Sequence, residues 1–154
     1  MYSTQLSRHV RAPRTSVYRA LLDPDAIARW RVPAGMRSQV HQFEPREGGA
    51  FRVSLTYDAP TATGKSTAHT DTYHGHFVTL VPDRQVVEAF EFESDDPELH
   101  GRMTMTTTLT DADGGTDVQM THAGIPDKIP VADNEAGTRM ALDNLARLVE
   151  TTAP

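Results

Sequence analysis

Cysteine is absent from the 154 residues of the chain. This excludes disulfide bonds, thiolate metal centres, iron–sulfur clusters and cysteine nucleophiles. No apolar run approaches the roughly 20 residues that a membrane-spanning helix needs. The opening residues MYSTQL show no basic start followed by an apolar stretch, as a secretory signal would. We therefore expect a cytoplasmic protein with no membrane span.

Positive charge is scarce, and the motifs of several catalytic classes are missing. Fifteen basic and 21 acidic residues give a net charge of −6, whereas a general nucleic-acid binder needs a basic surface. The sequence contains no Gly-x-Ser-x-Gly elbow, no phosphate-binding loop and no His-Glu-x-x-His zinc motif. We therefore predict no nucleic-acid partner, no catalytic residue and no cofactor.

The composition is that of an ordinary folded domain, with 38% hydrophobic and 23% charged residues. A chain of this length supports one hydrophobic core. We expect a single domain over residues 1–154, as a monomer or a homodimer.

The N-terminal quarter predicts a strand and two short helices. Residues 4–11 have the pattern of a strand, and residues 13–22 have apolar side chains at helical spacing. Asp23 followed by Pro24 is typical of a helix start, because aspartate caps the first turn and proline fits its first position. This second helix should extend to Trp30.

From residue 36 onward, alternating apolar residues predict six strands. The strands are expected over residues 40–43, 51–57, 70–81, 84–93 and 102–110, with a last strand from residue 116 that ends near residues 123–126. The segment over residues 58–66 is rich in turn residues and predicts a long hairpin loop.

The last hairpin also has a predictable register. Pairing Leu109 with Val118 keeps the apolar residues of both strands on one face, and a slip of one residue would separate them. In that register Met105 lies opposite His122, so His122 belongs to the face that points to the core.

The C-terminal segment over residues 133–150 has an apolar stripe at spacings of three and four, which predicts a long helix. The order of strand, two short helices, six strands and long helix indicates an α+β fold. A long antiparallel sheet that curls around one helix leaves room for a cavity between them.

Several motifs along the chain resemble one protein family. They include Ala12-Pro13, Leu22-Asp23-Pro24, Gly48-Gly49-Ala50-Phe51-Arg52, the stretch from Gly75 to Pro82, and Thr121-His122-Ala123-Gly124-Ile125-Pro126. Together the sequence resembles homologues of the activator of the 90-kDa heat-shock-protein ATPase, in the START-like (SRPBCC, birch-pollen-allergen-like) superfamily. The resemblance implies the helix-grip fold, a curved antiparallel sheet wrapped around a long C-terminal helix, with two short helices after the first strand. It also implies a ligand-sized cavity.

One position departs from that family pattern. The family usually has Gly-Trp near the start of the last helix, whereas here Gly137 is followed by Thr138. The cavity is therefore either wider at this point or filled from another side.

We predict that the cavity binds a small hydrophobic or amphipathic ligand. Its predicted lining consists of twelve residues: Trp30, Val53, Leu55, Tyr57, Phe77, Glu88, Phe90, Met103, Met105, Met120, His122 and Met140. Tyr57, His122 and Glu88 would orient the ligand. Two alternatives stay open, because Glu88 faces either the cavity or the solvent, and His122 is either a ligand contact or a hydrogen-bonded core histidine.

Two further groups of side chains have alternative interpretations. His74 and His76 share one face of a strand and could hold a metal ion with His122 or Glu88, or they face the solvent. We predict no metal site, because no third ligand with a known spacing accompanies them.

Arginine residues at positions 29, 31 and 37 surround Trp30. They either flank the cavity mouth and attract an anionic ligand or an acidic partner, or they are scattered over the surface.

The preferred function is therefore non-catalytic ligand binding. The first alternative is a single-domain, co-chaperone-like module that contacts a chaperone or another protein, for which an exposed apolar patch would argue. The second is an enzyme of the cyclase, dehydratase or hydrolase type, for which a cavity carboxylate or imidazole with a strongly shifted pKa would argue.

Overall fold

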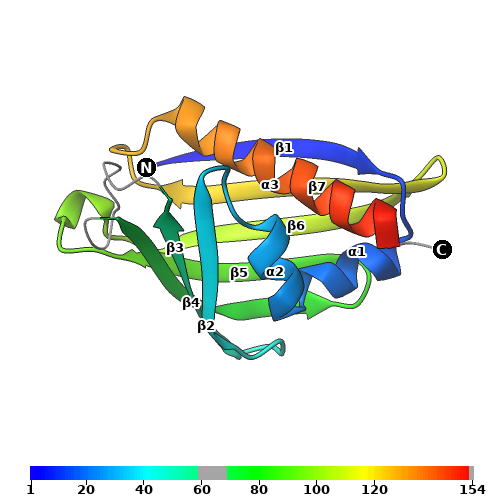
Figure 1. Ribbon diagram of the computed structural model, residues 1–154, viewed down its shortest axis with the longest axis horizontal. Coiled ribbons are helices and arrows are strands. Elements are labelled where there is room, and N and C mark those ends of the chain that lie inside the picture. The colour runs from blue at the N-terminus through cyan, green and yellow to red at the C-terminus, as the bar shows by residue number, and fades with distance from the viewer. Residues whose placement is uncertain (59–68, 153–154) are drawn as a thin grey trace.

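One seven-stranded antiparallel sheet and three helices make up the computed structural model, which describes residues 1–58 and 69–152 (Figure 1). The elements are β1 (Tyr2–Val10), α1 (Arg14–Leu21), α2 (Pro24–Trp30), β2 (Met36–Phe43), β3 (Ala50–Tyr57), β4 (Thr70–Val81), β5 (Gln85–Glu93), the 3₁₀ turn η1 (Pro97–Leu99), β6 (Met103–Ala112), β7 (Gly115–Ile125) and α3 (Val131–Thr152). The predicted α+β helix-grip architecture is confirmed.

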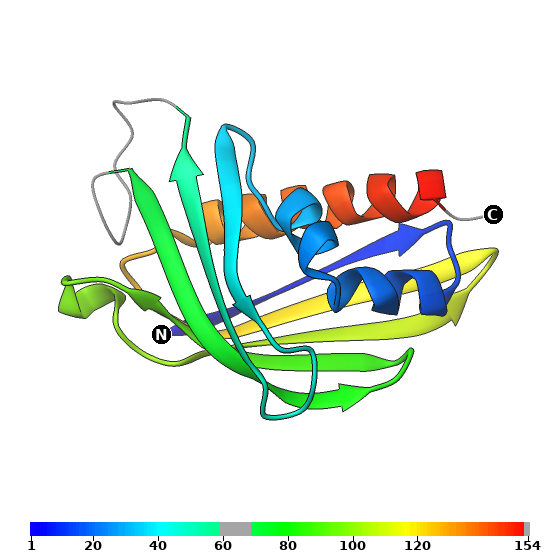
Figure 2. The ribbon, with the colours of Figure 1, turned by 60° about the horizontal axis from the view of Figure 1, so that its bottom comes forward.

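The strand order is β1-β7-β6-β5-β4-β3-β2, so the first strand joins the sheet beside the last. Figure 2 shows that the sheet curls and that α1, α2 and α3 all lie on its concave side. Side chains alternate between the faces: Phe51 and Val53 are buried on the inner face, whereas Arg52 between them is exposed. The sheet therefore has one face toward the helices and one toward the solvent.

The hairpin of β6 and β7 has the predicted register. Leu109 pairs with Val118, and Met105 pairs with His122. The turn consists of Asp113 and Gly114 alone, because Ala112 pairs directly with Gly115. Gly114 has a φ of 75°, a conformation that glycine adopts at little cost. This register places His122 on the inner face.

Helix α2 starts as the sequence predicts. The side chain of Asp23 accepts a hydrogen bond from the backbone N–H of Asp25 at 2.9 Å, and Pro24 occupies the first helical position. The helix ends at Trp30, whose indole Nε1 donates to the carbonyl of Ala20 at 3.0 Å. This buried bond ties the two short helices together.

The core lies between the inner face and α3. Phe77, Met103, Leu142 and Leu145 are among its fully buried side chains. Gly75 allows β4 and β5 to approach closely, since a Cβ atom there would lie 1.9 Å from the carbonyl oxygen of Ala89.

Most differences from the predicted boundaries concern element ends. The strand predicted over 40–43 begins earlier, at Met36, and the helix predicted over 133–150 extends from Val131 to Thr152. Apart from Asp58, the loop predicted over residues 58–66 lies outside the described residues. Within the described chain, no helix combines the length and the apolar character needed to cross a membrane.

Candidate functional site

A cavity of about 540 Å³ lies between the inner face of the sheet and α3. Nine of the twelve predicted lining residues border it: Trp30, Leu55, Tyr57, Glu88, Phe90, Met105, Met120, His122 and Met140. Most of these side chains are apolar. Glu88 therefore faces inward, which settles one of the two alternatives that the sequence left open.

Three of the predicted residues do not border the cavity. Val53, Phe77 and Met103 point to the same side of the sheet but are at most 1% exposed and belong to the core. The ring of Phe77 packs against Phe43 and Phe51, with centroid distances of 5.5 and 5.2 Å. Strand alternation predicts the face of a residue, but it does not predict where along the strand close packing replaces open space.

An ion pair between Arg31 and Glu88 is buried at the cavity wall. Arg31 Nη1 donates to Glu88 Oε1 at 2.7 Å, and the two side chains are 16% and 8% exposed. The guanidinium also lies over the rings of Tyr73 and Phe90, 5.4 and 5.6 Å from their centroids. Burial lowers the pKa of Arg31, but the charge of Glu88, the nearby Tyr73 and the hydrogen bond to Glu88 together outweigh it, so this pKa lies above its usual value and the arginine stays charged.

The backbone on either side of Arg31 is held by α3. The side-chain amide of Asn144 donates to the carbonyls of Trp30 and Val32 at 3.2 and 3.1 Å. These two bonds fix the chain as it leaves α2, and Arg31 turns inward between them. Arg31 is thus not part of a surface cluster with Arg37, which is exposed and pairs with Asp58 at 3.1 Å.

His122 is held by a short chain of hydrogen bonds. Its Nδ1 lies 3.0 Å from Nδ2 of Asn134, whose Oδ1 lies 2.6 Å from Oγ1 of Thr4. The other ring nitrogen, Nε2, is buried and has no hydrogen-bond partner among the described residues. Burial, and then the charge of Arg31, lower the pKa of His122 to about 4, so the imidazole is neutral at pH 7.

Tyr73 is the second buried polar group with an unpaired atom at this site. Within residues 1–58 and 69–152 its hydroxyl has no hydrogen-bond partner, and the residue is only 6% exposed. Burial raises the pKa of this hydroxyl and outweighs the opposing charge of Arg31, with a smaller raising contribution from Glu88, so the hydroxyl stays protonated. The ring of Phe90 contacts the rings of both Tyr73 and His122, with centroid distances of 5.7 Å and 5.4 Å.

Comparison with known protein families shows which family the chain belongs to. The family model described as "Activator of Hsp90 ATPase homolog 1-like protein" matches residues 11–150. The chain belongs to this family. The resemblance noted from the sequence motifs is therefore confirmed. No curated protein matches the sequence.

Solved structures agree with this assignment. Protein CV1439 from Chromobacterium violaceum is 33% identical, with a TM-score of 0.85 and 96% of each chain covered. An AHSA1-like protein from Aeromonas hydrophila shares the fold at 21% identity, with a TM-score of 0.72, over 97% of this chain and 93% of that one.

Helix α3 contributes small side chains to the cavity of this family member. Gly137, Thr138 and Ala141 all border the space, and a Cβ atom at Gly137 would meet no atom within 4 Å. The space between the helix and the sheet is therefore open at this point, where the sequence left a wider cavity as one of two alternatives.

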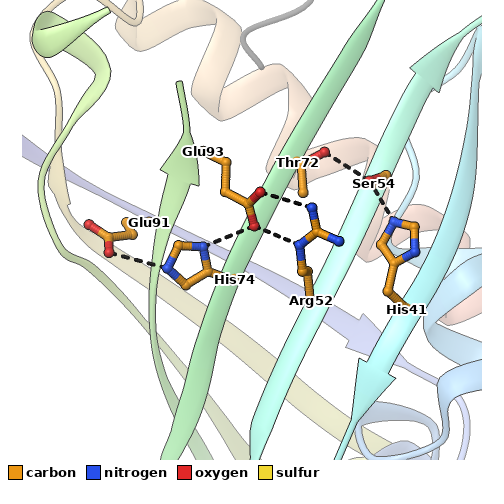
Figure 3. Close-up of polar contacts among 7 residues, drawn as sticks. All are labelled: His41, Arg52, Ser54, Thr72, His74, Glu91 and Glu93. Carbon is orange, nitrogen blue, oxygen red and sulfur yellow. Dashed lines mark hydrogen bonds and ion pairs between the residues drawn. The ribbon is translucent and has the colours of Figure 1, made fainter. Parts of the chain in front are cut away.

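The outer face of the sheet carries a separate polar network (Figure 3). Arg52 forms two hydrogen bonds with Glu93, at 2.8 and 2.9 Å, and His74 lies between Glu91 and Glu93. Ser54, on the same strand as Arg52, is hydrogen-bonded to His41 on β2 and to Thr72 on β4, each at 2.8 Å. All of these contacts lie on the face opposite the cavity.

The position of His74 bears on the metal hypothesis. His74 and His76 point to the outer face, whereas His122 and Glu88 border the cavity on the inner face, so these four residues do not come together. Across residues 1–58 and 69–152, no three histidine, aspartate or glutamate side chains are grouped so that they could hold a metal ion.

Sequence reasoning missed three polar residues of the site, namely Arg31 as an inward-facing group, Asn134 and Asn144. The two asparagines lie on the polar side of a helix pattern, where nothing distinguishes them from solvated residues. Tyr73 had a detectable signal, because it alternates with Asp71 and Phe77 on the inner face of its strand.

Proposed function

We propose that this protein binds a small hydrophobic or amphipathic molecule in the cavity between the sheet and α3. The observation that carries the proposal is the cavity of about 540 Å³ itself, with its mostly apolar lining. This volume lies within the usual range of small-molecule sites, about 300–1,000 Å³. A filled core at this place would have argued against binding.

The lining is adaptable as well as apolar. Met105, Met120 and Met140 border the space from β6, β7 and α3. Methionine side chains are unbranched and polarizable, so they repack around ligands of different shape. Affinity would come from the apolar area that the ligand buries, and the few polar groups would set its orientation.

Catalysis has weaker support than binding. His122 has the shifted pKa that the enzyme alternative calls for, but at about 4 it is a poor match for a general base working near neutral pH. Glu88 is engaged in its ion pair with Arg31.

The interaction-module alternative calls for an exposed apolar patch, and the described residues have few large apolar side chains at the surface. In the described residues, the exposed large apolar side chains are Met1, Val78, Val81 and Val131. Isolated exposed residues of this kind are normal on a protein surface.

Titration with Nile red, an uncharged hydrophobic dye, tests the proposal. The wild type should enhance and blue-shift the dye fluorescence with saturable binding, and Met120→Trp should fill the cavity and weaken binding at least tenfold. The matched control is Gln119→Trp, because it places the same ring on the opposite face of the same strand.

The larger side chain at Met120 should cost about 1–3 kcal/mol of stability, so the variant should remain folded. Circular dichroism checks this. Equal dye binding by wild type, Met120→Trp and Gln119→Trp would place the site elsewhere, and no binding by the wild type would defeat the proposal.

A further inference from the structure

The polar groups of the cavity define the ligand more closely than its volume does. We infer that the ligand is uncharged and carries a carbonyl-type oxygen that accepts a hydrogen bond from Nε2–H of His122. This inference rests on the proposed function, because it concerns the same cavity.

The hydrogen-bond distances decide which atom of Asn134 faces the histidine. The 2.6 Å separation between Asn134 and Thr4 fits an O–H···O bond and is short for an N–H···O bond. Oδ1 of Asn134 therefore faces the Thr4 hydroxyl, and Nδ2 faces Nδ1 of His122 at 3.0 Å.

This orientation fixes the tautomer of His122. The amide nitrogen of Asn134 can only donate, so Nδ1 of His122 must accept. In a neutral imidazole the hydrogen then sits on Nε2. This nitrogen is thus a donor for which the described part of the chain supplies no acceptor, and it belongs to a residue that is only 7% exposed.

A buried donor without an acceptor costs free energy, and a ligand oxygen placed against it removes that cost. The hydroxyl of Tyr73 is a second donor of the same kind, on the other side of the Phe90 ring. Both polar atoms are covered by neighbouring side chains, so a ligand oxygen reaches them only when lining side chains shift. The methionines of the lining can make such movements.

The charges around the cavity favour an uncharged ligand. Among the described residues, two cations line it, and both are already paired: Arg31 with Glu88, and Lys128 with Asp96 and Glu98.

Another carboxylate residue, Asp133, also borders the space. A carboxylate ligand would have to displace Glu88 from Arg31 or enter against this negative charge. An uncharged carbonyl compound meets neither obstacle.

Three probes of nearly equal shape test this inference by equilibrium dialysis at pH 7. They are 2-acetylnaphthalene, which has a carbonyl, 2-isopropenylnaphthalene, in which a methylene group replaces the carbonyl oxygen, and 2-naphthoate, which is an anion. The quantity of interest is the ratio of the alkene Kd to the ketone Kd, because it cancels the shared apolar contacts.

His122→Phe should lower this ratio roughly three- to tenfold relative to the wild type, as expected for one lost hydrogen bond. Tyr73→Phe is the second donor-removing variant and should also lower it. The control is Met140→Leu, which alters the lining without removing a donor and should leave the ratio unchanged. In the wild type, 2-naphthoate should bind at least tenfold more weakly than the ketone.

Each outcome decides between the two proposals. If the probes bind but the ratio is the same in the wild type and in His122→Phe, the cavity binds ligands and the inference about the carbonyl is wrong, whatever the ratio in Tyr73→Phe. Tighter binding of 2-naphthoate than of the ketone also overturns it. If none of the probes binds while Nile red also fails to bind, the proposed function itself fails, and the inference fails with it.

Discussion

Arg31 and Glu88 are 57 positions apart in the sequence, yet their charged atoms lie 2.7 Å apart inside the protein. One follows the last residue of α2, and the other lies in the middle of β5. Neither charge has much access to water, so each depends on the other for compensation.

This dependence predicts strong non-additivity of substitutions. Arg31→Met or Glu88→Leu alone should each lower the free energy of unfolding by about 3–5 kcal/mol, because each leaves one buried charge unpaired. The double variant should lose much less than the sum. Urea unfolding followed by circular dichroism measures all three. Strictly additive losses would mean that the pair is not coupled.

The exposed pair on the outer face supplies the matched control for that cycle. Glu93 also meets an arginine, Arg52, at 2.8 Å, but with 32% and 45% of the two side chains exposed. Water and salt screen such a pair, so Glu93→Gln should have a far smaller effect than Glu88→Leu.

The low pKa of His122 predicts a pH dependence of stability. The pKa is about 4 in the folded protein and near 6.5 in the unfolded chain, so the unfolded chain takes up a proton first as the pH falls. The contribution of this residue is therefore complete above pH 6.5 and is lost between pH 6.5 and about 4, amounting to about 3 kcal/mol.

His122→Phe should remove that part of the acid sensitivity. The free energy of unfolding, measured in urea between pH 7 and pH 4, should fall less steeply in the variant than in the wild type. Parallel curves for the two proteins would show that His122 titrates normally.

Gly137 predicts a rare substitution that stabilises the protein. It lies inside α3, where glycine is less favourable than alanine, and its Cβ position is open. Gly137→Ala should raise the free energy of unfolding by about 0.5–1 kcal/mol.

A larger side chain at the same position should act on binding instead. Gly137→Leu should reduce Nile red affinity by filling the cavity, whereas Ala136→Leu, at the exposed neighbouring position, should not. Equal affinities in the two leucine variants would show that this part of the cavity is not used.

At Gly75, substitution by alanine should destabilise the protein, in contrast to the same substitution at Gly137. A Cβ atom there would lie 1.9 Å from the carbonyl oxygen of Ala89 and 2.7 Å from Cα of Phe90, both of which are backbone atoms. Gly75→Ala should therefore force β4 and β5 apart and cost at least about 1–3 kcal/mol. Thermal unfolding compares it directly with Gly137→Ala, and a neutral Gly75→Ala would contradict the close approach.

Periodic patterns account for what could be predicted from the sequence. Alternation in two strands was enough to pair Met105 with His122, because only one register keeps both apolar sets on one face. The same reasoning placed most of the cavity lining.

The polar contacts could not be predicted in this way. The amide of Asn144 reaches Trp30 and Val32, and Asn134 reaches Thr4, across more than a hundred residues of chain. Such contacts depend on where α3 finally rests on the sheet. No local pattern encodes that position.

Under the proposed function, two different parts of the fold determine the size of the ligand and the chemical group that is recognised. Gly137, Thr138 and Ala141 leave the space on the helix side, whereas Tyr73 and His122 project from the sheet. Exchanging side chains on one helix face would then change which molecular sizes are admitted and leave the chemical group that is recognised unaltered. A lineage with this layout can diverge in ligand size by single substitutions that never disturb the strand pairing.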